Sequence, residues 1–484
     1  MVPKASNRIH LPVRFRVGVA LSVMVAIATT VAAVTLPNLF PFMDPSGVME
    51  TYSATGAFNE NGPFFQVLGT NGRTCGTCHV VNNAMGLSAA TAESIYERTN
   101  GHDPLFAKVD GAACPTATAG HPLNHNLLRQ YGLFRIALQL AATPQFTITA
   151  VHDPYGCALV TDPATGIVTV SVYRRPLPGT NLRFLTAVQF DGRETVMPLN
   201  NTQTFAANLI TDLKHQALDA TTGHGQATTP PTDAQQTDIV NFELALNSAQ
   251  AVDFRAGVLN SGGANGGPRF VKGVSFFPGI NDPLGGNPTG AAFDPNAFTI
   301  YSKWINSADS YRRSVARGEE VFNTHPVLIT DVRGLNDALG VSVINGTCTT
   351  CHDAPNVGDH SLPVPLEIGT SRSANFETNA QIQAAVSQLS MPDLPVFQIV
   401  CNQGPDSGEI TYTSDPGKAT LTGACVDVGR GKGPILRGLA ARAPYFHNGA
   451  AATLDEVVDF YNVRFQMNLT AQEKRDLVNF LKTL

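Results

Sequence analysis

The chain has 484 residues with a formal net charge of −6, and only 14% of its residues are charged. Because no basic run follows the first sixteen residues, the composition argues against nucleic acid as a partner. The length is sufficient for two or three domains, and 43 glycines with 32 prolines predict many ordered loops.

The first 36 residues predict export. Four basic residues and no acid occupy positions 1–16, and residues 17–36 then run without a charge. This apolar run is long for the core of a signal peptide and just sufficient to span a bilayer. Segment 1–36 is therefore either a signal that is removed or an N-terminal membrane anchor, and the body of the protein is predicted to lie in the periplasm.

Residues 44–256 are predicted to form an N-terminal helical domain, interrupted at 100–187 by a β-containing insertion. Within the insertion, "FTITAV" and "GIVTVSVY" alternate around the turn "DPATG", which is typical of a β-hairpin or small sheet. Helical periodicity returns at 208–220 and at 233–250. The apolar residues at helical spacing in the latter are Ile239, Phe242, Leu246 and Ala249.

Residues 257–300 are rich in glycine, proline and asparagine and are predicted to form a linker or wrapping loop. A C-terminal domain is predicted over 301–484, with a helix at 314–324 near its beginning. Two helices close the chain, and a capping box precedes each of them: Thr453 with Glu456, and Thr470 with Glu473.

The pattern C-x-x-C-H occurs twice, in "TCGTCH" at 74–79 and in "TCTTCH" at 347–352. It is the attachment pattern of c-type haem, in which both cysteines bond to one porphyrin and the histidine binds the iron. The predicted fold is therefore mainly α, with two cytochrome c-like haem domains. Two covalently bound haem c groups are predicted, one at Cys75, Cys78 and His79 and the other at Cys348, Cys351 and His352.

Zinc is the alternative group that paired C-x-x-C motifs can bind. A zinc ribbon places its ligand pairs roughly 15–20 residues apart, far closer than the two motifs lie here. Zinc also does not require a histidine directly after each pair. The spacing therefore favours haem at both motifs.

Four cysteines remain outside the two motifs, and an even number in an oxidising compartment favours disulfides. Each pair lies within a loop-rich stretch. We therefore predict the disulfides Cys114–Cys157 and Cys401–Cys425, with free buried thiols as the alternative.

The stretch "GPILRGLAARAPYFHNGAAATLDEVVDFYN" at 433–462 resembles the bacterial di-haem cytochrome c peroxidase and MauG superfamily. The C-terminal domain of that family carries a similar L-R…A-P-Y-F-H…T-L stretch. "FDGRE" at 190–194 and "LKHQALDA" at 213–220 are similar to the family's W-D-G-R…L-x-x-Q-A segment. The resemblance implies that the N-terminal haem reacts with hydrogen peroxide and that the C-terminal haem relays electrons.

On the peroxide side of the first haem, the family's distal glutamine matches Gln216. Gln226 stands where the family has a distal glutamate, and an amide cannot take a proton from peroxide. His224 lies two residues earlier and is predicted to be the distal base or a reversible sixth ligand. The alternative is a mobile surface histidine. His215 and His102 are weaker candidates.

Between the haems, the resemblance places Phe190 where the family usually has tryptophan, whereas the single tryptophan, Trp304, lies elsewhere in the sequence. Phenylalanine is harder to oxidise than tryptophan, so electron exchange through Phe190 is expected to be slower or to rely on direct tunnelling. The alternative role of Phe190 is core packing.

At the second haem, the family places the sixth iron ligand fourteen residues after the histidine of "PYFHNG". Counting from His447 gives Tyr461, as in the MauG-like branch, where the peroxidases have methionine. A phenolate favours ferric and higher-valent iron, and methionine raises the potential. A core tyrosine is the alternative, with Met467 and Met391 as fallback ligands. Arg437 and His447 are expected to line this haem.

The predicted function is a periplasmic di-haem oxidoreductase that reduces hydrogen peroxide, with a small cytochrome, a copper protein or an oxidisable protein substrate as electron donor. The alternatives are a haem oxygenase acting on an organic substrate and an electron-transfer cytochrome without catalysis. The family often holds calcium between its domains through backbone oxygens. Such ligands leave no trace in a sequence, so the calcium ion stays an open expectation.

Overall fold

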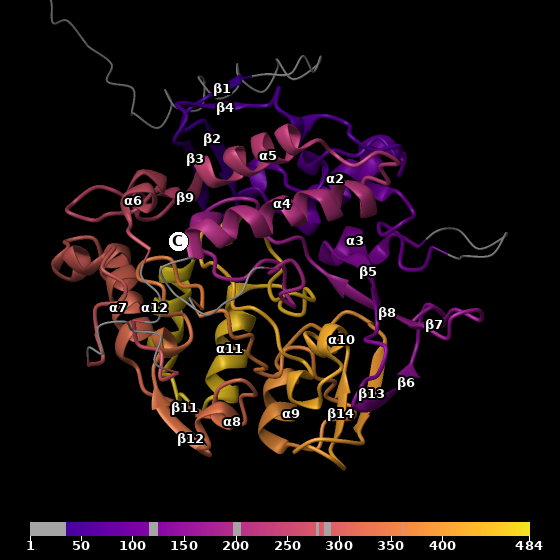
Figure 1. Ribbon diagram of the computed structural model, residues 1–484. Coiled ribbons are helices and arrows are strands. Elements are labelled where there is room, and N and C mark those ends of the chain that lie inside the picture. Colours follow the sequence, from indigo (N-terminus) through magenta and orange to yellow (C-terminus); the bar gives the residue numbers. More distant parts are fainter. Residues whose placement is uncertain (1–34, 116–123, 197–204, 277–279, 285–291, 361) are drawn as a thin grey trace, which may run out of the picture.

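A computed structural model describes residues 35–115, 124–196, 205–276, 280–284, 292–360 and 362–484 (Figure 1). Of the predicted export segment, residues 1–34 lie outside this described part. Its last two residues belong to strand β1 (Thr35–Pro37), which pairs with β4 (Ala57–Asn59). In the described part, no helix combines the length and apolarity needed to cross a membrane.

Five small sheets with antiparallel pairings occur in the described residues, so the prediction of a mainly α fold is not confirmed. Beside β1–β4, one sheet has the order β10 (Gly257–Val258), β9 (Leu246–Asp253), β3 (Gly47–Ser53), β2 (Pro41–Asp44). A two-stranded sheet pairs β11 (Val327–Thr330) with β12 (Val343–Gly346). A three-stranded sheet has the order β14 (Ile410–Thr413), β13 (Val396–Cys401), β6 (Phe146–His152). The last sheet has the order β5 (Phe134–Gln139), β8 (Val168–Arg174), β7 (Leu159–Thr161). Several of these pairings join distant parts of the chain, which local periodicity cannot reveal.

The predicted hairpin of the insertion is wrong in one respect. The turn at 162–166 does join two paired strands, β7 and β8. The "FTITAV" strand, β6, instead pairs with β13, some 250 residues later in the sequence. Both strands have the alternating pattern, and the burial of Phe146 and Ile399 in one apolar cluster decides which strand pairs with which.

The predicted helix at 233–250 ends early. Helix α5 (Asp233–Ala245) begins at a capping box formed by Thr232 and Gln235, and β9 starts at the next residue, Leu246. Residues 246–253 pair with β3 along their length. The helical spacing of their apolar residues is therefore overridden by tertiary strand pairing.

The remaining helices are α2 (Ala89–Thr99), α3 (Asn126–Tyr131), α4 (Phe205–Gly223), α6 (Pro268–Gly273), α7 (Ser310–Thr324), α8 (Asn336–Leu339), α9 (Ala380–Val386), α10 (Ala419–Thr422), α11 (Leu454–Arg464) and α12 (Ala471–Leu481). The helices expected near 208–220 and 314–324 are thus confirmed as α4 and α7. The stretch 257–300, expected to be loop throughout, contains β10 and α6.

The caps of the two closing helices differ from each other. Thr470 and Glu473 form the predicted capping box at α12. At α11, Thr453 caps the backbone N–H of Glu456 as expected, but the Glu456 carboxylate accepts from Ala452 N–H instead of closing the box. Glu456 also accepts hydrogen bonds from Ser390, which ties the start of α11 to the loop after α9.

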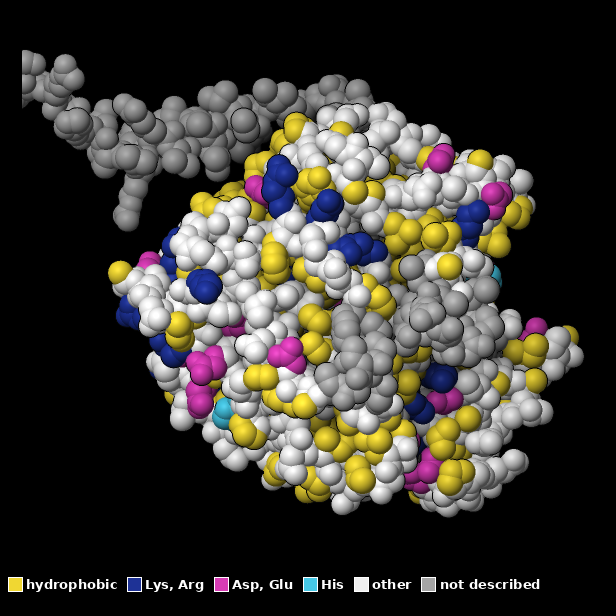
Figure 2. Space-filling model, turned by 60° about the vertical axis from the view of Figure 1, so that its left-hand side comes forward, with side chains coloured by type: hydrophobic (Ala, Val, Ile, Leu, Met, Phe, Trp, Pro, Cys, Tyr) yellow, Lys and Arg dark blue, Asp and Glu magenta, His cyan; other side chains and the backbone are white. Residues whose placement is uncertain are grey.

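Helix α4 crosses the molecule in the view of Figure 1, with α5 above it and α7, α11 and α12 below it. The largest apolar cluster gathers residues from 256 onward, including Trp304, which donates its indole N–H to Ser261 O. The C-terminal residue Leu484 accepts from the backbone N–H groups of Gln250 and Gly438. On the face seen in Figure 2, acidic and basic side chains are interspersed with apolar ones.

Both predicted disulfides, Cys114–Cys157 and Cys401–Cys425, are confirmed. The second one joins the end of β13 to the 3₁₀ turn η10 (Cys425–Asp427) and closes a loop of 24 residues. We expect the double replacement Cys401→Ser, Cys425→Ser to lower the free energy of unfolding by about 2–5 kcal/mol, because the open loop gains conformational entropy on unfolding. Denaturant unfolding of the purified protein measures this loss, and an unchanged midpoint would contradict it.

Candidate functional site

The first C-x-x-C-H motif is a 3₁₀ turn, η3 (Cys75–Thr77), closed by reciprocal hydrogen bonds between Thr74 and Thr77. His79 follows the turn, and its Nδ1 lies 3.0 Å from Met85 O. A carbonyl oxygen can only accept, so Nδ1 carries the proton and Nε2 keeps its lone pair. Burial also lowers the pKa of His79. The neutral imidazole therefore has the form that binds a metal.

The second motif repeats this arrangement. The turn η9 (Cys348–Thr350) is closed by Thr347 and Thr350, and His352 Nδ1 lies 2.6 Å from Gly358 O. Burial lowers the pKa of His352 as well. In both motifs the carbonyl belongs to the sixth residue after the histidine. Both histidines are thus oriented in the same way, as two sites for the same kind of group require.

The motif cysteines fit thioether formation better than zinc. They form no disulfide. The described residues form two clusters of side chains able to hold a metal ion, and neither contains a cysteine.

A cavity adjoins the first motif and is lined by both halves of the sequence. Its walls include Cys75, Cys78 and His79, one face of α4, the segment 174–182, and the C-terminal residues Lys432, Ile435 and Arg437. Two buried guanidinium nitrogens of its lining, Arg175 Nε and Arg437 Nη1, have no hydrogen-bond partner. Apolar walls with cationic groups that each keep one nitrogen free fit a porphyrin, whose carboxylates such groups bind. The cavity therefore fits haem c.

Arg437, which the sequence predicts at the second haem, lines this first cavity and also contacts the loop that follows the second motif. Its Nε donates to Asn356 O at 2.9 Å, and Nη2 reaches the same oxygen. Asn356 belongs to the loop that follows the second motif. Arg437 therefore connects the first cavity with the second motif.

Gln216 and His224 both line the cavity, as predicted for distal residues. His224 Nδ1 lies 2.5 Å from Asp110 Oδ2, and Asp110 is also bound by Arg73. Since a carboxylate accepts the Nδ1 proton, Nε2 of His224 is left with its lone pair. Gln226 is exposed and contacts Asn71.

The weaker histidine candidates lie apart from the cavity lining. His215 Nδ1 is bound to Glu194 Oε2 at 2.7 Å, and His102 is exposed. The sequence analysis missed Asp110 and the cavity residue Glu243, whose burial raises its pKa to about 8. Asp110 is 114 residues from His224, and no spacing rule connects such positions.

Phe190 lines the cavity and stacks on His447, with ring centroids 4.1 Å apart and planes at 12°. The guanidinium of Arg174 also packs on Phe190, with its central carbon 4.9 Å from the ring centroid. A side chain at Gly431 would collide with the Phe190 ring, so the close approach requires glycine there. Phe190 thus lies between the first cavity and the segment that carries His447.

His447 is buried, and burial lowers its pKa to about 4 despite the nearby carboxylate of Asp415. It is therefore neutral at ordinary pH. Asp415 binds Arg174 through both oxygens, at 2.7 and 2.8 Å, and Arg174 also binds Asp191 at 2.5 Å. Burial alone would raise the pKa of Asp415, but Arg174 outweighs burial and holds the pKa below its usual range.

We expect Asp415→Asn to destabilise the protein by about 3–5 kcal/mol, because it leaves the buried Arg174 partly unpaired. Asp415 has a lowered pKa, so its contribution is present above the ordinary carboxyl pKa and is lost as the pH falls through the folded-state value. Thermal and denaturant unfolding measure both effects. The control is Asp393→Asn, which breaks an exposed pair with His152 and is expected to cost less than about 1 kcal/mol. Equal losses in the two variants would contradict this prediction.

Tyr461 faces the second motif from α11, with its ring centroid 6.4 Å from that of His352. Burial raises the Tyr461 pKa above its usual range. Met467 and Met391 pack in apolar clusters, and the backbone carbonyl of Met467 accepts from His325. Tyr461 is thus placed beside the motif, as its predicted role requires.

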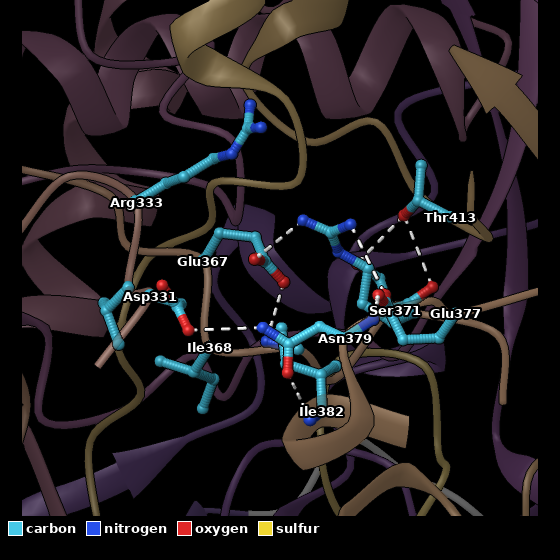
Figure 3. A network of polar contacts seen from close by, with 12 residues as sticks. Asp331, Arg333, Glu367, Ile368, Ser371, Glu377, Asn379, Ile382 and Thr413 are labelled. Atoms are coloured by element: carbon cyan, nitrogen blue, oxygen red, sulfur yellow. Dashed lines mark hydrogen bonds and ion pairs between the residues drawn. The ribbon is translucent and has the colours of Figure 1, made fainter. Parts of the chain in front are cut away.

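A buried polar network holds α11 in place. Arg464, three residues after Tyr461, donates to Ile368 O at 2.9 Å and to Thr330 O at 2.8 Å. Beside these bonds, the guanidinium of Arg372 pairs with Glu367 and Glu377. Asn379 reaches Asp331 (Figure 3). These bonds connect β11, the loop before α9 and α11. The position of Tyr461 therefore depends on three separate segments.

Comparisons with known proteins agree with the haem motifs. No protein-family model matches the chain. Over 149 residues it is 32% identical to a cytochrome-c peroxidase of Denitromonas iodatirespirans, covering 29% of this chain and 36% of that protein. Over 207 residues it is 27% identical to a cytochrome-c peroxidase of Pseudomonas sp. (strain SCT), covering 38% of this chain and 51% of that protein.

A third relative is the cytochrome c551 peroxidase of Nitrosomonas europaea, 35% identical over 100 residues, which are 18% of this chain and 30% of that protein. A crystal structure of a MauG-like protein associated with microbial copper homeostasis matches 68% of this chain and 79% of that one at 15% identity, with a TM-score of 0.27. The chain thus aligns with about half or less of these three peroxidases. The aligned parts of the chain thus resemble cytochrome c peroxidases in sequence.

Proposed function

We propose that the protein is a periplasmic di-haem c-type oxidoreductase that reduces hydrogen peroxide. Two haem c groups would be held by the motifs at 74–79 and 347–352, within haem domains at 44–256 and 301–484. The observation that carries the proposal is the cavity where Gln216 and the His224–Asp110 pair share the lining with His79. The named relatives, all cytochrome c peroxidases, support it.

Haem held at the first motif would supply the electron-transfer chemistry that cleaves the O–O bond. The residues of the chain would do the rest. His224 Nε2 accepts a proton from peroxide and returns it to the departing oxygen. Asp110 holds the imidazole by its Nδ1–H, and Gln216 orients peroxide through its amide.

Electrons would enter at the second haem from a small cytochrome, a copper protein or an oxidisable protein substrate. The stacked Phe190–His447 pair would lie on the path to the first haem, and Tyr461 would be the sixth ligand of the second haem. The calcium ion that the resemblance implies would be held between the two domains by backbone oxygens.

Electron paramagnetic resonance of the ferric protein tests the proposal. We expect a high-spin haem signal that disappears after one equivalent of hydrogen peroxide. If both signals are low-spin and indifferent to peroxide, the measurement is repeated on half-reduced protein, where reductive activation would open the site. Indifference to peroxide and cyanide in both states would overturn the proposal in favour of an electron carrier. Oxygen binding to the reduced first haem without a reaction with peroxide would favour the oxygenase.

A further inference from the structure

A buried cluster of three side chains adjoins the second motif. Asp353 follows His352 in the sequence, His360 lies seven residues later, and Asp282 comes from a separate loop. All three are buried, with exposed fractions of 0%, 3% and 6% respectively. One ligand atom of each lies within 4.8 Å of the others.

His360 points into this cluster without a hydrogen bond. Its Nδ1 lies 3.5 Å from Asp353 Oδ2 and 3.8 Å from Asp282 Oδ2. Neither ring nitrogen has a hydrogen-bond partner in the described structure, and Asp282 Oδ2 has none either. A buried imidazole without a hydrogen bond is costly, and a cation between these atoms would bind it together with the two carboxylates.

The distances match those of atoms that share a metal ion. Two ligand atoms bound about 2.1 Å from a tetrahedral ion lie about 3.4 Å apart, whereas a hydrogen bond would bring them to about 2.8 Å. A divalent cation between these atoms would also offset the repulsion between two adjoining buried carboxylates.

We propose that Asp282, Asp353 and His360 bind one divalent first-row transition metal ion, and that this ion is zinc. Two carboxylate oxygens and an imidazole nitrogen form a zinc-type ligand set, completed by a water molecule. Calcium is disfavoured, since it takes six to eight oxygen ligands. The site is separate from the haem irons and does not depend on the proposed peroxidase activity.

The neighbouring bonds indicate a structural role. Asp282 Oδ1 accepts from Leu284 N–H at 2.7 Å, which orients the carboxylate. Asn281, next in the chain, donates to Thr349 Oγ1 at 2.8 Å, inside the second motif. The metal ion would therefore fasten the loop at 280–284 to the haem-attachment segment of the C-terminal half.

Metal analysis of the haem-loaded protein tests the site. The protein is treated with EDTA, incubated with zinc chloride, desalted and analysed for zinc and iron by mass spectrometry. We expect one zinc ion per chain in the wild type and its loss in His360→Ala. The matched control is His215→Ala, in the second cluster with Glu194 and Asp219, which is expected to keep its zinc.

Haem absorbance per chain shows whether each variant is folded. If His360→Ala does not yield folded protein, Asp282→Asn is used in its place. As a second readout, added zinc is expected to raise the Tm of the wild type and of His215→Ala but not of the His360 or Asp282 variant. A wild type without zinc, a His360 variant that keeps it, a loss in His215→Ala, or retention of calcium in competition with zinc would each overturn the proposal.

Discussion

Replacing His224 with alanine is expected to lower kcat/KM for hydrogen peroxide by about 100-fold or more, the usual contribution of a positioned general base. His224 lies in the cavity lining with its Nδ1 bound to Asp110. That contact leaves Nε2 free to take a proton, whereas the exposed Gln226 offers only an amide. Steady-state peroxide kinetics with a reduced small cytochrome measure the loss.

The control for this variant is His102→Ala, because His102 is exposed and lies outside the cavity lining; its kcat/KM is expected to be unchanged. Asp110→Asn tests the positioning role of the carboxylate. We expect it to lower kcat by less than His224→Ala and to shift the pH profile, since the amide no longer selects one tautomer of His224. Full activity of His224→Ala with intact haem absorbance would show that another group moves the proton.

Replacing Tyr461 with methionine is expected to raise the reduction potential of the second haem by on the order of 100 mV or more, within the roughly 0.8 V that axial ligands span. Methionine favours ferrous iron, whereas a phenolate favours the ferric state. Tyr461 has the required position, facing His352 from α11 with ring centroids 6.4 Å apart. Spectroscopic redox titration of both haems measures the shift.

Tyr461→Phe separates ligation from packing, since it keeps the ring and removes the oxygen. If Tyr461 is the sixth ligand, this variant loses the spectrum of a six-coordinate second haem while the first haem is unchanged. The matched control is Tyr412→Phe, on β14, where the hydroxyl accepts a hydrogen bond from Gln398. An unchanged potential and spectrum in both Tyr461 variants would exclude ligation by Tyr461.

The stacked Phe190–His447 pair explains how a chain without tryptophan at this position closes the contact between its two halves. The rings lie 4.1 Å apart, and Gly431 leaves room for them. His447 is kept neutral by burial, so the stack adds no charge between the two motifs. Phe190 is therefore held in place by specific contacts, whatever its part in electron exchange.

Local features of the fold were predictable because their determinants lie within a few residues. Each C-x-x-C-H segment forms the same turn, and each histidine is oriented by a carbonyl six residues later. The capping box at α12 and the hairpin turn at 162–166 likewise depend on neighbours in sequence. Both disulfides followed from the number and spacing of the cysteines left over.

Non-local contacts were not predictable in this way. The pairing of β6 with β13 and the strand conformation of 246–253 depend on partners far along the chain, which the periodicity of a single segment does not contain. The same holds for Asp110 beside His224, and for Asp282 beside His360. The same holds for Arg437, which lines the first cavity and bonds to Asn356 after the second motif.

The sequence by itself thus determined which groups the chain offers to haem, because covalent attachment requires a short and invariant spacing of cysteine and histidine. The tertiary structure alone decided which side chains surround those groups. Packing brings together residues more than a hundred positions apart, and burial then sets their charge, as it does for Glu243 and His447. The identity of the cofactor is therefore encoded locally, whereas the chemistry at its open face depends on contacts that only folding creates.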